Sequence, residues 1–271
     1  MPEATHHDLH VDSPTPSSTG RSATGDLSSR AAGWGALTFA VVVIAQNVIR
    51  GAFAPGNGAS AAKVLSDYSG DGAIPYVLAA TYVVSGVGMA VFLGGVTRHL
   101  LATSRRGWAM TGVVGAIGIM IVFTLVVAAE QALTVVAHMD RPDLGALQAV
   151  WALHNSTFTV LDLWIAIALL GLSRAAVAAG MTPRAFTWLA PLGAALLVVG
   201  VVGGPAIAAG HVMVLFGAAG LGFLIWLGFL VVTGARLVRT AQPARQPTYH
   251  PRTRTAAVRL RGPGPGASRL S

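Results

Sequence analysis

Six polar side chains stand inside or at the ends of long apolar stretches, where chemistry-bearing groups are rare. They are Glu130, His154, Asn155, Asp162, His211 and Asn47. An ionisable group within a membrane span is costly, so each such residue is a candidate for function. Carboxylates and histidines inside helical bundles are used as proton relays, and histidine can also ligate haem iron.

The spacing of these residues predicts contacts between some of them. His154 and Asp162 lie eight residues apart, which places them on roughly one helix face. Glu130 lies at a depth similar to that of His154, so the two can pair across neighbouring helices. No basic residue lies in mid-span beside Asp162, and its carboxyl is therefore expected to carry a proton at rest. Three interpretations stay open: a structural hydrogen-bonded knot, an outward-facing solute or proton site, and a haem held by His154 and His211.

Motifs of soluble enzymes are missing from the chain. There is no phosphate-binding GxxxxGK[ST] loop, no GxSxG nucleophile motif and no HExxH zinc motif. The chain has no cysteine, which excludes disulfides, thiolate metal sites and cysteine nucleophiles. We therefore predict no catalytic residue, no metal site and no cofactor.

Composition predicts the elements that hold these residues. Hydrophobic residues make up 54% of the chain and charged residues only 10%. A membrane-spanning helix needs about 20 mostly apolar residues, and the continuous apolar runs lack the alternation of a membrane β-barrel. The sequence predicts an all-α polytopic transmembrane bundle with six spans, at about 32–49, 74–96, 108–133, 147–172, 186–203 and 211–233.

Polar tails are expected on both sides of the bundle. Residues 1–30 are predicted to be a disordered polar tail, 31–240 the six-helix bundle, and 241–271 a disordered Arg-rich tail. The Arg-rich tail is interpreted first as a solvated topology anchor without a ligand, and second as a segment that contacts anionic lipid headgroups. Nucleic acid is disfavoured, because the tail lacks aromatic stacking platforms. The lipid bilayer is thus the expected partner, and the sequence predicts no oligomeric state.

Basic residues predict the orientation. With six spans, fifteen of the eighteen Lys and Arg residues fall on the side of the two termini. The opposite side keeps Arg50, Lys63 and Arg141. Loops rich in Lys and Arg stay in the cytoplasm. Both termini are therefore predicted to be cytoplasmic, and 50–73 and 134–146 to be outside.

The first outer loop carries a helical pattern. Ser60 can cap a helix whose Ala61, Val64, Leu65 and Tyr68 fall on one face. Such a helix can lie flat on the outer surface as a lid, or it can be an ordered loop without that role.

Small residues recur at three- or four-residue spacing in several spans, which lets helix backbones approach closely in lipid. These are expected to be contacts within one bundle. The sets are Gly86/Ala90/Gly94, Gly112/Gly115/Gly118 and Gly200/Gly204/Ala208.

The arrangement resembles a known group of proteins. The outer-loop run from Ser60 to Tyr68, a second span that ends near Arg98, and a fourth span that opens with Trp151-Ala152-Leu153-His154-Asn155 carry the resemblance. They are similar to uncharacterised six-helix integral membrane proteins of high-GC bacteria, of the domain-of-unknown-function type, over about 31–240. The resemblance implies a fold and an inner-membrane location and transfers no activity.

Together these features predict a non-enzymatic integral membrane protein of the bacterial inner membrane, with a polar cluster in its outer half. The alternatives are a proton-coupled small-solute transporter, in which Asp162 and Glu130 carry protons, and a haem-binding membrane oxidoreductase that uses His154 and His211.

Overall fold

The computed structural model describes residues 21–240 apart from Asp71 and Val212. The predicted Arg-rich tail 241–271 lies outside the described residues, as does 1–20 of the predicted N-terminal tail. Within the described part the chain is helical and holds no strand, so the all-α prediction is confirmed. The helices are α1 (Arg21–Phe53), α2 (Ala61–Tyr68), α3 (Ile74–Leu101), α4 (Arg106–Ala137), α5 (Leu144–Ala178), α6 (Phe186–Val202), α7 (Gly204–Ala208) and α8 (Met213–Thr240).

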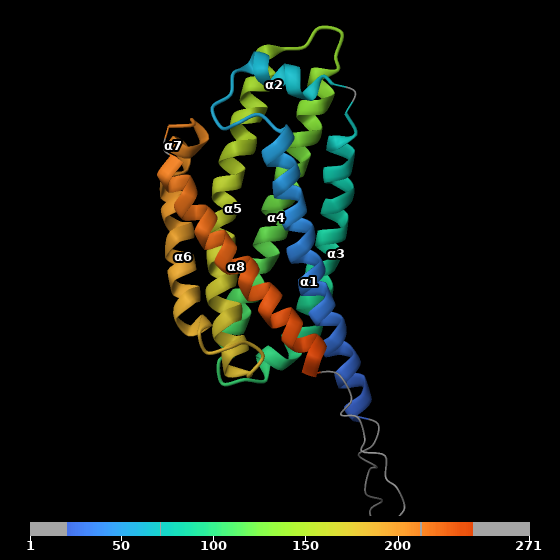
Figure 1. Ribbon diagram of the computed structural model, residues 1–271, viewed down its shortest axis with the longest axis vertical. Coiled ribbons are helices and arrows are strands. Elements are labelled where there is room, and N and C mark those ends of the chain that lie inside the picture. Colours follow the sequence, from blue (N-terminus) through green and yellow to red (C-terminus); the bar gives the residue numbers. More distant parts are fainter. Residues whose placement is uncertain (1–20, 71, 212, 241–271) are drawn as a thin grey trace, which may run out of the picture.

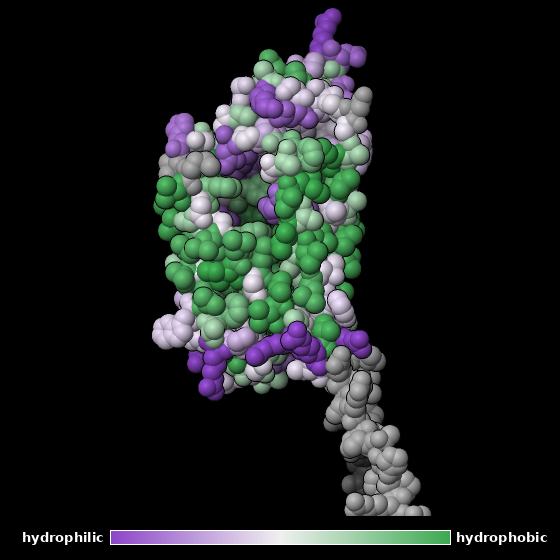
Figure 2. Space-filling model, viewed as in Figure 1, coloured by the Kyte–Doolittle hydropathy of each residue, from purple (hydrophilic) through white to green (hydrophobic). Residues whose placement is uncertain are grey.

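Five of the described helices are long and apolar enough to cross a membrane: α1, α3, α4, α5 and α8. The apolar helix α6 has 17 residues, a length of about 25 Å at 1.5 Å per residue. It ends at Val202, and the separate helix α7 begins at Gly204 with Pro205 in its first turn, where proline is tolerated. Figure 2 shows an apolar band around the middle of the visible face, with hydrophilic residues gathered at both ends.

The helices extend beyond the predicted apolar runs. α1 begins at Arg21, inside the segment predicted as a tail, and it continues past Arg50 to Phe53. α5 begins at Leu144 because Asp143 caps it, with its Oδ1 accepting hydrogen bonds from the backbone N–H groups of Gly145 (2.8 Å) and Ala146 (3.1 Å). Such caps satisfy N–H groups that the helix leaves unpaired. Hydropathy alone does not detect these polar ends.

The closest helix pair is α4 with α5, which stand side by side in the centre of the bundle (Figure 1). A Cβ atom placed on Gly171 would lie 2.2 Å from the backbone nitrogen of Gly112. The two backbones therefore touch without side chains between them. The buried core is built around this pair: α3 packs against α4 and α6 against α5, while α1 and α8 pack against each other and against α3 and α6 respectively.

The short helix α2 lies across one end of the bundle, which we call the α2 end (Figure 1). Ser60 caps it, as predicted, and accepts a hydrogen bond from the backbone nitrogen of Lys63 at 3.4 Å. Val64 is completely buried against α4 and α5, and the predicted face is turned toward the bundle. Lys63 is on the exposed face, where it pairs with Asp67. α2 is thus an amphipathic helix with its apolar side down.

Two loops at the α2 end of the bundle pack backbone against backbone. Gly58 and Gly210 both have positive φ angles, of 74° and 76°. A Cβ on Gly58 would lie 2.6 Å from the carbonyl oxygen of Ala209, and one on Gly210 would lie 2.7 Å from that of Asn57. Glycine is required at both positions by backbone conformation and by space. The backbone of the loop that leads into α2 is therefore in direct contact with the backbone of the loop after α7.

Candidate functional site

A buried ion pair joins α1 to α4 beneath α2. The Nε atom of Arg50 lies 2.6 Å from Oε1 of Glu130, and its Nη2 lies 3.0 Å from Oε2. Both side chains are more than nine-tenths buried. This two-point geometry is the strong form of the arginine–carboxylate contact. Because Arg50 stands near the end of α1, the pair lies toward the α2 end of the bundle.

His154 on α5 extends this pair to a third helix. Its Nε2 lies 3.3 Å from Oε1 of Glu130, and its Nδ1 lies 3.2 Å from Oδ1 of Asn155. Both residues of α5 are buried. Of the two carboxylate oxygens of Glu130, one therefore serves both Arg50 and His154, and the other serves Arg50 alone. We call Arg50, Glu130, His154 and Asn155 the polar cluster.

Aromatic rings enclose the polar cluster. The ring of Trp151 stacks on that of His154, with centroids 4.8 Å apart and planes at 14°. The guanidinium carbon of Arg50 lies 5.4 Å from the ring centroid of Phe123 and 5.6 Å from that of Phe158. Rings on either side of a guanidinium add a cation–π attraction. They also keep the polar groups in a region of low polarity, where electrostatic contacts are stronger.

The helix α2 covers the polar cluster, with its Tyr68 packed beside Trp151. Its ring lies 6.4 Å from that of Trp151, which in turn stacks on His154. Burial raises the pKa of Tyr68, and the nearby carboxylate of Glu130 raises it further. Tyr68 is thus an uncharged, half-buried cover. Any movement of α2 would change the surroundings of the polar cluster directly.

Several buried polar atoms at this site have no hydrogen-bond partner in the described part of the chain. They are Nη1 of Arg50, Nε1 of Trp151, Nδ2 of Asn155 and Oε1 of Gln46. Gln46 lies one turn before Arg50 on α1, and its Nε2 donates to the hydroxyl of Thr81 at 3.0 Å. Buried polar atoms are nearly always paired, so unpaired ones need an explanation. Here the unpaired atoms belong to two residues of the polar cluster, Arg50 and Asn155, and to two neighbours of it, Trp151 and Gln46.

Figure 2 shows that the visible face is hollowed in the upper part of its apolar band, between α1 and the upper part of α8, with hydrophilic atoms at its rim. At the end of the bundle away from α2, the two helices touch. There a Cβ on Gly33 would lie 2.7 Å from the carbonyl oxygen of Gly234. α5 lies behind the gap, and its Phe158 and Asp162 are only partly buried. α1 and α8 are therefore in direct contact at one end and separated by this hollow toward the α2 end.

The structure brings together three of the six residues singled out from the sequence: Glu130, His154 and Asn155. Asn47 is exposed, and its amide donates to the carbonyl of Val43 on its own helix. His211 is exposed in the loop after α7. Neither of these two makes a hydrogen bond or ion pair to the polar cluster.

Asp162 lies apart from the polar cluster. Its carboxylate faces α6, since a Cβ on Gly200 would lie 3.0 Å from Oδ2. Eight residues along a helix amount to two turns plus about 80°, which rotates Asp162 away from the side on which His154 meets Glu130. The side chain is half-buried where α5, α6 and α8 approach one another.

Sequence reasoning missed Arg50, which was assigned to the outer loop because it follows the apolar run. A signal was present. Gln46 and Arg50 are four residues apart and therefore share a face of α1, whereas Asn47 is rotated by about 100° from Gln46. A basic residue one turn after a buried amide indicates that the helix and its inward face continue.

Within the described residues no group of three or more His, Asp and Glu side chains could hold a metal ion. Both ring nitrogens of His154 have side-chain partners. A haem iron at His154 would have to displace Glu130 or Asn155.

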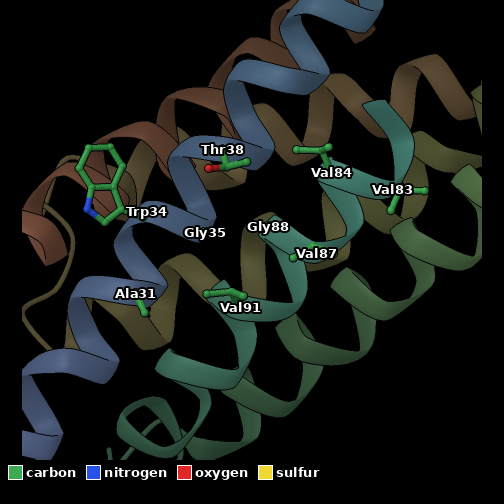
Figure 3. Close-up of a pocket in the computed structure, with 9 residues that line it drawn as sticks. All are labelled: Ala31, Trp34, Gly35, Thr38, Val83, Val84, Val87, Gly88 and Val91. Atoms are coloured by element: carbon green, nitrogen blue, oxygen red, sulfur yellow. The ribbon is translucent and has the colours of Figure 1, made fainter. Parts of the chain in front are cut away.

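A separate apolar groove lies on the outside of the bundle between α1 and α3 (Figure 3). Gly35 and Gly88 bring the two backbones together at its floor, and valines of α3 form one wall. Thr38 contributes the polar side chain among its lining residues. The groove faces outward and has no residue in common with the polar cluster.

The fold and the site suggest a membrane-embedded helical protein with a covered polar centre. Comparison of the chain with protein-family models, with curated proteins and with solved structures finds no match. The site must therefore be interpreted from its own geometry.

Proposed function

We propose that this chain is a six-span protein of the bacterial inner membrane with both termini in the cytoplasm, and that its polar cluster is an outward-facing binding site for a small polar solute. α6 is the sixth span of this proposal, extended by α7. The role is non-enzymatic: solute binding that is coupled to the position of α2, as in a sensor. The resemblance to six-helix proteins of high-GC bacteria is part of the same proposal.

One observation carries the binding function. The polar cluster holds a buried ion pair and unpartnered N–H groups on Arg50 and Asn155, and the adjoining Trp151 adds a third such group. Unpaired donors would not be expected in a cluster with only a structural role, because each buried unpaired donor lowers the stability of the fold by about 1–3 kcal/mol. A site that receives a polar solute requires such groups. α2 packs its Tyr68 on Trp151 beside the cluster and would be the cover of this site.

The orientation is tested with single cysteines, because the natural chain has none. Ser66 on α2 and Ser104 between α3 and α4 are both exposed. In intact cells, Ser66→Cys should react with a membrane-impermeant maleimide, whereas Ser104→Cys should react only after the membrane is opened. The opposite pattern would show that the orientation is reversed.

The binding site is tested in the same way. Asn155→Cys places a thiol in the polar cluster at little change of volume. If α2 opens to admit solutes, an impermeant thiol reagent applied from outside should label this variant at a slow but measurable rate. Labelling should become faster when Val64→Asp loosens α2, because Val64 is completely buried beneath that helix.

Ser173→Cys is the matched control for this experiment. Ser173 is fully buried on the same helix, toward its other end, and its cysteine should stay protected. Protection of Asn155→Cys to the same extent as Ser173→Cys, with and without the Val64→Asp change, would contradict an outward-facing site.

A proton-coupled transporter is the second candidate, and the half-buried Asp162 favours it. This carboxylate lies at the meeting point of α5, α6 and α8, near mid-membrane, and has no hydrogen bond within the described residues. Intramembrane carboxylates of this kind serve as proton carriers in pumps and transporters. The two candidates differ in whether the solute crosses the bilayer.

A further inference from the structure

The groove between α1 and α3 is apolar and faces the outside of the bundle (Figure 3). Its volume is about 470 Å³, which lies in the range of ordinary ligand sites, about 300–1,000 Å³. Val84, Val87 and Val91 form one wall, and β-branched side chains of this kind have little rotational freedom. The exposed ring of Trp34 stands at the α1 side. The groove is therefore preformed and suits a thin apolar chain.

A helix from a second copy of the protein fits this groove less well. Helices approach closely in lipid where small residues face each other. The glycines of the groove, Gly35 and Gly88, already face each other, since a Cβ on Gly35 would lie 2.6 Å from the carbonyl oxygen of Gly88. The side chains left at the mouth are mostly valine and tryptophan. The groove thus offers a further helix no smooth stripe, whereas a hydrocarbon chain needs none.

Two arginines stand at the end of the groove away from α2. Arg30 lies one turn before Trp34 on α1, and it is exposed. Arg98 lies two turns after Val91 on α3, and it is exposed as well. Each arginine therefore continues a face that lines the groove. Among the residues that the structure describes, neither arginine has a partner in a hydrogen bond or an ion pair.

Both arginines lie next to one crossing of the two helices. A Cβ on Gly95 would lie 2.8 Å from the carbonyl oxygen of Ser28, so α1 and α3 touch within one turn of Arg30 and of Arg98. Guanidinium groups bind phosphate oxygens at two points. Counted along α1, the groove spans residues 31–38, about 10 Å, and one leaflet of the hydrocarbon core is about 15 Å deep. A phosphate bound by the arginines would therefore have its acyl chains at the depth of the groove.

We propose that this groove binds an anionic phospholipid, with one acyl chain between α1 and α3 and the phosphate held by Arg30 and Arg98. Trp34 then stands near the headgroup, the level at which tryptophan is enriched in membrane proteins. The apolar walls match the acyl chain, and the two positive charges match the phosphate. The proposal goes beyond solute binding at the polar cluster and does not depend on it, because the groove and the cluster share no residue.

The test uses the full-length protein in phosphatidylcholine nanodiscs with a small share of phosphatidylglycerol that carries a photoreactive diazirine along one acyl chain. After illumination, mass spectrometry of peptides locates the labelled residues. Label should concentrate on residues 31–38 of α1, compared with 117–124 of α4, which help to line a second apolar groove between α3 and α4. Unlabelled phosphatidylglycerol should compete for the groove. Free glycerol phosphate, which is the headgroup without acyl chains, should not.

The double variant Arg30→Gln/Arg98→Gln removes the phosphate contacts. Each basic residue near an anionic headgroup strengthens binding by about fivefold, so the label in the groove should fall by at least about tenfold. Arg105→Gln/Arg106→Gln is the matched control, because both arginines are exposed at the same end of the bundle but outside the groove. It should leave the label unchanged. The Arg-rich segment 241–271 is present in every variant, so its own attraction for anionic lipid cancels.

Val87→Phe tests the apolar part of the site. Val87 is 59% exposed, so a larger side chain there should narrow the groove without disturbing the core. The variant should keep the Tm of the natural protein in phosphatidylcholine alone, and the label on residues 31–38 should be lost. The arginine variants test the proposal independently if Val87→Phe does not fold.

Three outcomes would each overturn the proposal. The first is a photoreactive phosphatidylcholine that labels residues 31–38 as strongly as the phosphatidylglycerol does, since the headgroup charge would then have no role. The second is equal label on 31–38 and 117–124, or an unchanged label in Arg30→Gln/Arg98→Gln, which is the pattern of general lipid contact. The third is a natural protein that is dimeric and becomes monomeric with Val87→Phe, because the occupant would then be a second copy.

Discussion

Replacing Arg50 with methionine should lower the free energy of unfolding by about 3–5 kcal/mol, because it leaves the charge of Glu130 buried without its partner. The double variant Arg50→Met/Glu130→Leu should be markedly more stable than this single variant. Removing both members of a buried ion pair is often neutral or stabilising, although here His154 also loses its contact with Glu130. Equilibrium unfolding in mixed micelles measures both changes.

An exposed ion pair on the same end of the protein is the control. Lys63 and Asp67 on α2 also form a close ion pair, but the Lys63 side chain is 60% exposed. Lys63→Met should therefore change stability by no more than about 1 kcal/mol. Equal losses for Arg50→Met and for the double variant would contradict the importance of the pairing itself.

The fold was largely predictable from the sequence because long apolar runs can only be helices when they cross a bilayer. The ends of the helices were harder to predict from the sequence. Arg50 lies beyond the apolar run yet inside α1, and its partner on α4 is eighty positions away in the chain. Which residue meets a buried carboxylate depends on how helices pack, and periodicity contains no such information.

In the candidate site, the depth of a residue along the bundle was easier to predict than the side of the helix on which the residue lies. Matching depth correctly paired Glu130 with His154, since both lie toward the α2 end of neighbouring helices. Direction was harder to predict. Gln46 is buried and Asn47 exposed, although the two are adjacent and equally polar. Asp162 was expected to share a face with His154, but over two turns the helix rotates it toward α6.

Small-residue patterns were informative where a neighbouring helix packs against them. The set Gly112/Gly115/Gly118 on α4 meets Gly171, Ala168 and Trp164 of α5. In the set on α3, Gly94 faces open space, whereas Gly88, which lies outside that set, touches the backbone of Gly35. Four-residue spacing creates a smooth stripe on any helix. The facing helix determines whether the stripe is used.

Gly171→Leu should therefore prevent α4 and α5 from packing. The first side-chain atom alone would lie 2.2 Å from the backbone nitrogen of Gly112 and 2.4 Å from its Cα. Backbone cannot move aside as a flexible side chain can, so the loss should exceed the usual cost of overpacking, about 1–3 kcal/mol. Gly171→Ala should already destabilise, and both effects are measured as a lower Tm of the purified protein.

Gly94 supplies the matched control, since it lies in a long helix and a Cβ added there would have no neighbouring atom within 4 Å. Gly94→Ala should be neutral or stabilising by up to about 1 kcal/mol, because alanine favours the helix over glycine. Gly94→Leu should be tolerated as well. Opposite signs for alanine at 171 and at 94 would identify backbone contact as the cause. If Gly171→Leu melts at the temperature of the natural protein, α4 and α5 do not touch there.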